Sequence, residues 1–213
     1  MRVLLIHTCG VEGSVAVADG FVRASAVLPP RTFSEGLLPA VRSVLAEAGW
    51  GVGDLEAVGV VTGPGSFTGV RTGLSVGKGI CEARGIPLVG VSRLALLAGG
   101  DGLCHALLDA GRGEFYYGRY RDAVCEVESL VRREELEGLL ADKGRVVACE
   151  DKVIAELAAF GVEAVPEPSA GDALGFVLAG LRDGQEGVLG DANYLRRTDG
   201  EIFANPMVGR VTT

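Results

Sequence analysis

The chain has 213 residues and a formal net charge of −8, and 48% of its residues are hydrophobic. This length predicts one large domain or two small lobes, and the apolar share is enough for a sizeable core. Nucleic-acid-binding proteins usually carry a basic face. The acidic balance therefore argues against direct, tight binding of tRNA or DNA by this chain alone.

The five cysteines are odd in number and widely spaced, and the sequence has no C-x-x-C. This pattern predicts free thiols in a reducing compartment rather than a disulfide framework or a zinc site. The first apolar run, residues 3–6, is too short for a secretory signal, and no run reaches the length of a membrane span. We expect a soluble, cytoplasmic protein.

The first half alternates short apolar runs with helical patterns. We predict a meander of three strands at residues 2–7, 14–20 and 21–28, a helix from Glu35 to Ala48, a strand at 55–62, a helix continuing to about Arg84, a strand at 86–91 and a helix through Ala98. Ser34 and Ser92 are the expected N-caps, and Gly49 is the expected stop of the first helix. Pro39 fits only near the first turn of that helix.

The second half repeats this order more loosely. We predict a hairpin at 103–110 and 113–122, a third strand at 123–131, helices at 133–141, 152–160 and 170–184, and strands at 145–150 and 162–166. The repetition places a lobe boundary near Gly99, giving lobes 1–99 and 100–213. The tail towards Thr213 is expected to be loop.

A glycine-rich stretch, "VVTGPGSFTGVRTGLSVGKG", joins a predicted strand to a predicted helix. It is not a P-loop, because no hydroxyl residue follows Lys78, and its glycine spacing misses the dinucleotide fingerprint by one residue. A Gly-Pro-Gly turn that leads into a helix is still a generic anion site. Phosphate contact therefore stays open.

Within the predicted helix, Gly69, Gly73 and Gly77 recur every four residues along one ridge. Each interior glycine costs about 0.8–1 kcal/mol relative to alanine, so the ridge predicts an unusually close neighbour. The neighbour is either an internal helix or a helix of another subunit. The helix at 35–48 is the obvious candidate, with a stripe of apolar residues: Leu37, Leu38, Val41, Val44 and Leu45.

Residues that could carry catalysis are few. His7 and His105 are the only histidines, and no H-x-x-x-H pair or G-x-S-x-G elbow is present. Asp109 could ligate Mg²⁺, but a turn-capping role is favoured. Arg71 and Arg112 are candidates for contact with an anion or an acidic partner.

Four segments together resemble the bacterial TsaB family, also called YeaZ: "GPGSFTGVRTGLSVGKG", "SRLALLA", "LDAGRGEFYYGRY" and "NYLR". The resemblance covers nearly the full length, and "GPGSFTGVR" is highly specific. It implies an α/β fold of the actin/Hsp70/sugar-kinase type (ASKHA), built from two ribonuclease-H-like lobes.

The resemblance also implies a role in placing the threonylcarbamoyl group on adenosine 37 of ANN-decoding tRNAs. In that family the protein is a non-catalytic scaffold for TsaD, TsaE joins the complex, and the isolated protein forms a homodimer through the same helical face. It implies no catalytic residue, no metal and no cofactor of the chain's own, and it leaves open ATP or ADP at the interface with TsaD. The residues carried over as an interface, or as lying close to a nucleotide, are Gly63, Pro64, Gly65, Ser66, Phe67, Thr68, Gly69, Arg71, Gly73 and Gly77, with the apolar stripe of the 35–48 helix beside them.

The sequence departs from the family pattern at three places. His7 stands where the first strand usually ends in Asp, Phe33 replaces a common His, and Gly111 replaces an Arg beside Arg112. A histidine cannot replace an oxygen ligand of Mg²⁺, which favours the scaffold. The alternatives are a nucleotide-dependent enzyme or an M22-type glycopeptidase of the same fold, and a nucleotide-binding module without turnover. The role of the tail after Asp199 stays open.

Overall fold

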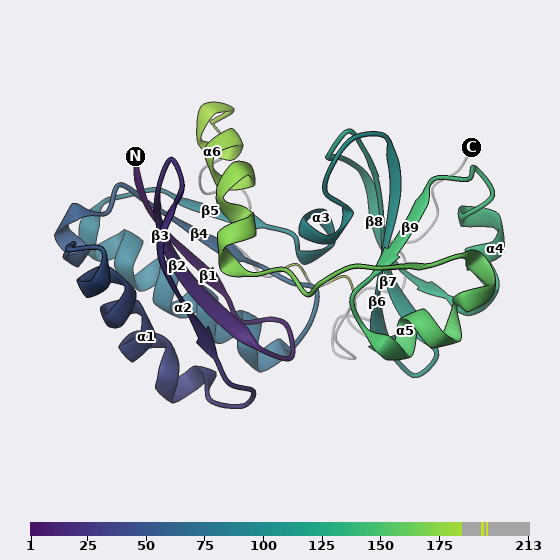
Figure 1. Cartoon of the computed structure of the whole chain (residues 1–213), viewed down its shortest axis with the longest axis horizontal. Helices are drawn as coiled ribbons and strands as arrows, with labels where there is room; N and C mark the ends of the chain where they lie inside the picture. Colours follow the sequence, from purple (N-terminus) through teal and green to yellow (C-terminus); the bar gives the residue numbers. More distant parts are fainter. Residues whose placement is uncertain (185–192, 194, 196–213) are drawn as a thin grey trace, which may run out of the picture.

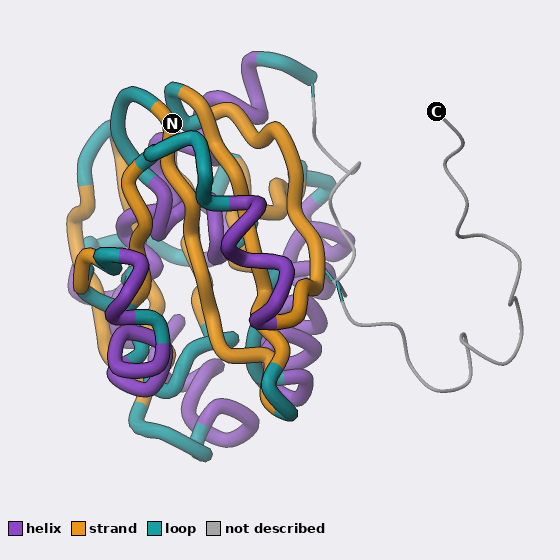
Figure 2. Tube along the Cα trace, turned by 90° about the vertical axis from the view of Figure 1, so that its right-hand side faces the viewer, coloured by secondary structure: helices purple, strands orange, loops and turns teal. Residues whose placement is uncertain are grey.

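The structure is a computed structural model that describes residues 1–184, 193 and 195. Two five-stranded sheets lie beside each other and are joined by short chain segments and helix α3 (Figure 1). Figure 2 looks from the side of the second sheet, where strands run alongside one another.

The first sheet confirms the predicted meander followed by helix–strand alternation. Its strand order is β3-β2-β1-β4-β5, in which β1 to β3 pair antiparallel and β4 and β5 add in parallel. The strands are β1 Arg2–His7, β2 Gly13–Asp19, β3 Val22–Leu28, β4 Ala57–Val61 and β5 Leu88–Val91. Every residue of β4 and β5 is buried, as expected for parallel strands covered on both faces.

Helices cover both faces of this sheet (Figure 1). Helices α1 (Phe33–Glu47) and α2 (Phe67–Arg84) lie on one face, and the turn η3 (Ala170–Ala173) with helix α6 (Leu174–Arg182) lies on the other. A short turn, η1 (Val52–Asp54), precedes β4. Four residues of the apolar stripe of α1 pack into the core beneath the sheet, namely Leu37, Val41, Val44 and Leu45.

The start of α1 differs from the expectation. The helix begins at Phe33 after Thr32, so Ser34 is its second residue and not its N-cap. Phe33 is buried and packs in the core, which fixes the first turn earlier than the capping pattern suggested. Pro39 consequently lies inside the helix, beyond its first turn, whereas Gly49 follows the helix with a φ of 71° and confirms the predicted stop.

The second sheet repeats the topology of the first, with the order β10-β9-β6-β7-β8. Its strands are β6 Leu103–Gly111, β7 Glu114–Arg121, β8 Val124–Arg132, β9 Arg145–Ala148 and β10 Glu163–Ala164; its helices are α3 Arg93–Ala98, α4 Arg133–Leu139 and α5 Asp151–Glu156, and the turn η2 is Ala158–Phe160. Helices α4 and α5 cover one face and α3 packs on the other. The predicted α/β fold of two ribonuclease-H-like lobes is confirmed.

The chain does not divide cleanly at residues 99 and 100. Leu94 and Leu97 of α3 pack in a core cluster with residues of the second sheet. Ala170 and Val177, which the sequence assigned to the second lobe, pack against the first sheet. Helix α3 of the expected lobe 1–99 thus packs on the second sheet, and α6 of the expected lobe 100–213 packs on the first sheet.

The glycine ridge of α2 faces the first sheet. A Cβ added at Gly69 would lie 1.8 Å from the carbonyl oxygen of Thr8, and one at Gly73 would lie 2.5 Å from the Thr8 hydroxyl. At Gly77 the nearest atom would be a methyl of Val60, at 2.7 Å. The predicted close approach is therefore present, but the neighbour is the sheet of the same chain and not a second helix.

Gly69→Ala is expected to lower the free energy of unfolding by more than about 2 kcal/mol, because backbone atoms of Thr8 must move to admit the methyl group. Gly79→Ala on the same helix is the matched control. A Cβ at Gly79 meets nothing within 4 Å, so the substitution should raise the stability by about 0.8–1 kcal/mol. Urea unfolding of both variants measures this, and equal effects would contradict the packing of the ridge.

Candidate functional site

The turn between β4 and α2 is held against the end of β1. Ser66 caps α2 by accepting a hydrogen bond from the Gly69 amide at 3.2 Å, and the Ser66 amide donates to the carbonyl of Cys9 at 2.8 Å. A Cβ at Gly65 would lie 2.1 Å from that carbonyl oxygen. The Gly-Pro-Gly turn, in which the Gly63–Pro64 peptide is cis, is thus shaped by close approach to the β1–β2 turn.

A cleft of about 460 Å³ opens beside the N-terminus of α2. Hydroxyl groups, glycine backbone and one arginine face it, together with apolar side chains: the lining residues are Gly10, Val11, Pro30, Arg31, Phe33, Ser34, Ser66, Thr68 and Gly69. Helix N-termini favour negative charge because their first amide groups lack partners within the helix. The cleft could therefore receive an anionic group.

His7 ends β1 and is fully buried. Its Nε2 lies 3.9 Å from the Cys9 Sγ and 3.7 Å from an oxygen of Glu167, and its Nδ1 has no hydrogen-bond partner among the described residues. Burial lowers the pKa of His7 from its usual 6.5 to about 4, against the opposing effect of the Glu167 charge. Burial likewise raises the pKa of the Cys9 thiol to about 12. Both groups are therefore uncharged at neutral pH.

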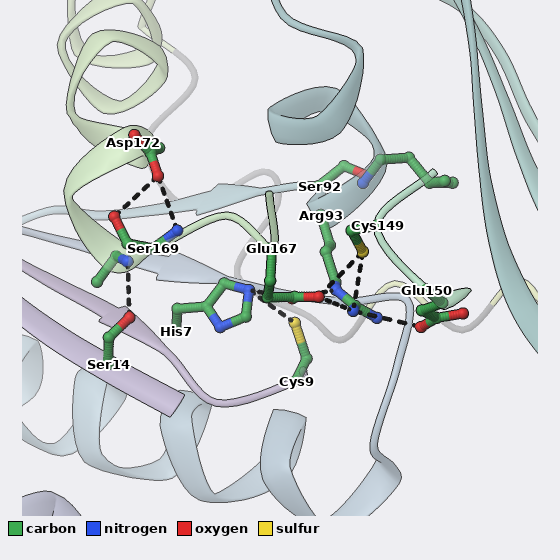
Figure 3. Close-up of polar contacts among 12 residues, drawn as sticks. His7, Cys9, Ser14, Ser92, Arg93, Cys149, Glu150, Glu167, Ser169 and Asp172 are labelled. Carbon is green, nitrogen blue, oxygen red and sulfur yellow. Dashed lines mark hydrogen bonds and ion pairs between the residues drawn. The ribbon is translucent and has the colours of Figure 1, made fainter. Parts of the chain in front are cut away.

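Next to His7, Arg93 at the start of α3 forms a buried ion network between the two sheets (Figure 3). Its Nε donates to Glu167 Oε1 at 2.8 Å and its Nη2 donates to Glu167 Oε2 at 2.5 Å. Nη2 also donates to Glu150 at 3.3 Å, and Cys149 donates to Glu167 at 3.0 Å. Burial alone would raise the pKa of Glu167, but the hydrogen bonds and charge of Arg93 hold it below its usual value.

A second network surrounds Glu128 of β8. Ser92 Oγ donates to the Glu128 carboxylate at 2.5 Å, and the Tyr120 hydroxyl donates to the same oxygen. Asn193 donates its side-chain amide to the other oxygen at 2.6 Å, while its backbone amide donates to the carbonyl of Thr62 at 2.9 Å. Consecutive residues therefore bind different acids of the second half: Ser92 binds Glu128, and Arg93 binds Glu167 and Glu150.

The structure separates the residues that the sequence grouped as an interface. Gly63, Pro64 and the three ridge glycines are buried, whereas Ser66, Phe67, Thr68 and Arg71 are exposed and Gly65 is half-buried. In α1 the buried members are Leu37, Val41, Val44 and Leu45, and Leu38 is 52% exposed. The three ridge glycines and the buried members of α1 pack on the chain's own sheet. An interface role for the grouped residues stays a prediction.

The other candidate residues have local partners. The guanidinium carbon of Arg71 lies 3.8 Å from the centre of the Phe67 ring. Asp109 accepts from the Gly111 amide and binds Lys152 at 2.7 Å, as the turn-capping interpretation favours. His105 forms hydrogen bonds with Tyr117 and Asp142, which both belong to its own half of the chain. Arg112 lies in the β6–β7 turn with a φ of 60°.

Sequence reasoning missed the ion network. Arg93 offered one signal, because it is the only charged residue in the apolar helix "RLALLA" and follows a predicted cap. Glu167 and Glu150 offered none, since they lie in irregular segments.

Among residues 1–184, 193 and 195, no three His, Cys, Asp or Glu side chains are grouped so that they could hold a metal ion. None of the helices within this part of the chain is long and apolar enough to cross a membrane. The tail after Asp199 lies outside the described residues.

Comparison with known proteins gives two relatives that carry the same name. The chain is 38% identical over 128 residues to the tRNA threonylcarbamoyladenosine biosynthesis protein TsaB of Escherichia coli K12, covering 57% of this chain and 55% of that protein. It is 33% identical over 148 residues to the Bacillus subtilis protein of the same name, covering 67% and 64%. The matched stretches thus span less than two thirds of these relatives.

A solved structure, YeaZ from Pseudomonas aeruginosa, is 25% identical with a TM-score of 0.77 and is matched over 91% of this chain and 99% of that one. The family model described as TsaD, tRNA N6-adenosine threonylcarbamoyltransferase, matches residues 26–181. The chain therefore belongs to the family that this model describes, and within it to the TsaB group, also called YeaZ.

Proposed function

We propose that this chain is a non-catalytic subunit in the threonylcarbamoylation of adenosine 37 of ANN-decoding tRNAs, where it acts as a scaffold for TsaD and TsaE joins the complex. The names of its TsaB relatives support the pathway. The observation that carries the scaffold role is the end of β1, where a neutral, buried histidine stands beside an arginine that is already paired with carboxylates.

This donor set suits neither an independent phosphotransferase nor a metallopeptidase. Mg²⁺ prefers carboxylate and carbonyl oxygens, and His7 supplies a nitrogen. The nearest carboxylate, Glu167, is bound by both nitrogens of the Arg93 fork. A guanidinium so close would oppose a cation at the same place. The side chains around His7 and Arg93 therefore favour a structural role.

The outward face of α1 and α2 is the surface that we propose for TsaD. These helices cover the first sheet on the side away from α6 (Figure 1). Leu38 is 52% exposed and Phe67 is 48% exposed, and apolar side chains of this size are typical anchors of protein interfaces. We infer that the isolated chain pairs with a second copy through the same face, so that the homodimer and the TsaD complex exclude each other.

A nucleotide at the interface is a second candidate function, supported by the cleft at the start of α2. We propose that ATP or ADP binds there when TsaD completes the cleft. Ser34→Glu would place a negative charge in this cleft, at the start of α1, where acidic residues are tolerated. Calorimetric titration should show ADP binding to the complex that is at least tenfold weaker with Ser34→Glu and unchanged with Ser43→Glu, an exposed position further along α1. Equal affinities in all three complexes would remove the cleft from consideration.

Leu38→Glu is expected to weaken TsaD binding at least tenfold, because a charge replaces an exposed apolar contact while the core side of α1 is untouched. Light scattering of mixtures and tRNA threonylcarbamoylation with TsaD and TsaE from the same source measure the effect. Val124→Glu is the control, since it places the same charge on an exposed residue of β8 in the other sheet. Full modification activity without this chain would refute the scaffold role; a normal complex with Leu38→Glu would refute only this face.

The buried neutral state of His7 predicts a loss of stability in acid. Because the folded pKa of about 4 lies below the usual 6.5, unfolding takes up a proton between these values, and stability falls as the pH falls from 6.5 to 4. The loss amounts to roughly 3 kcal/mol. His7→Gln should flatten this part of the curve in urea unfolding from pH 4 to 7. Identical pH profiles would show that His7 is charged or exposed in solution.

A further inference from the structure

The carboxylate of Glu167 is held in the manner of a bound anion. Arg93 presents two parallel donors to its two oxygens, at 2.8 and 2.5 Å, and the Cys149 thiol donates to one of them at 3.0 Å. Paired, coplanar donors of this kind are the usual recognition of carboxylate and phosphoryl groups by arginine.

The other side of the carboxylate lies against the turn after β1. A Cβ at Gly10 would be only 2.5 Å from Glu167 Oε1, so a larger residue there would displace the carboxylate from its present position. Glu167 itself comes from the segment between β10 and η3, distant in sequence (Figure 3). The turn, the guanidinium and the thiol thus form one pocket around an acidic group that a separate segment inserts.

The two members of the ion pair differ in exposure. The Arg93 side chain is 3% exposed, whereas that of Glu167 is 30% exposed. The cation therefore belongs to the buried wall of the pocket, and the carboxylate enters from the side that solvent reaches. An outside anion could approach by the same route if the carboxylate were absent.

We propose that this pocket is an oxyanion site, suited to a carboxylate or phosphoryl group, which the chain keeps occupied with its own Glu167. The wild-type protein is thereby closed to phosphate-bearing ligands beside Arg93. An ion pair that only supports the fold would differ from such a site in one respect. Its geometry would require Glu167 as part of the chain, so a free anion could not replace the carboxylate.

Glu167→Ala tests this difference in the full chain. Removing the carboxylate leaves a buried cation with only Glu150 beside it, and the melting temperature should fall by roughly 10 °C. Acetate or inorganic phosphate should then raise it in a concentration-dependent way, as mass action requires. Sodium chloride at equal ionic strength should not, and the wild-type protein should show no such specific response.

Glu163→Ala is the matched control, because Glu163 forms an equally bidentate pair with Arg145 on the exposed surface. It should change stability little and should not respond to either anion. Arg93→Met combined with Glu167→Ala removes the cation as well and should abolish the response.

The proposal is overturned if neither anion stabilises Glu167→Ala beyond chloride, or if the response persists without Arg93. If Glu167→Ala does not fold alone, refolding in acetate or phosphate supports the site, and failure to refold in both overturns it. These measurements use this chain alone, so their outcome does not depend on whether it binds TsaD.

Discussion

The junction of the two sheets depends on the burial of one positive charge. Arg93 is 2% exposed, and a guanidinium out of water is tolerated only when carboxylates surround it. Its partners come from two places, the segment after β10 and the segment after β9. Those segments are therefore positioned by charge as well as by apolar packing. Because Ser92 binds Glu128 at the same time, the start of α3 fixes three parts of the second half.

The same junction explains why glycine is concentrated where it is. In the turn after β1, Gly10 lies against an oxygen of Glu167. In the turn before α2, Gly65 lies against the carbonyl of Cys9. One turn further, α2 lies so close to β1 that the Thr8 hydroxyl donates to the Gly69 carbonyl at 2.7 Å. The turn before α2 and the first turn of α2 thus approach the backbone after β1 closely at Gly65 and Gly69. The glycine-rich stretch is in this respect a packing motif, whatever binds beside it.

Much of the fold could be predicted from the sequence, because local patterns determine it. Alternation gave β2 and β3, the apolar stripe gave α1, and Ser92 and Gly49 marked helix ends that the structure confirms. The ridge of α2 was a different case: regular glycines indicate that something lies close, but not whether it is a helix, a sheet or another chain. The ion network could not be predicted, since Glu167 lies between two prolines with no periodicity, and its meeting with Arg93 exists only in three dimensions.

The return of the chain to its first sheet has a consequence for synthesis. Gly59 of β4 is so close to α6 that an added Cβ would lie 2.4 Å from Val177, so this helix seals the centre of the first sheet. On the ribosome, the five strands of that sheet emerge long before residues 170–182 do. One apolar face of an otherwise complete sheet therefore stays uncovered while the second half is synthesised. Such an intermediate is the kind of species that chaperones protect. The first half of this protein therefore depends on α6, the last helix within residues 1–184, to finish folding.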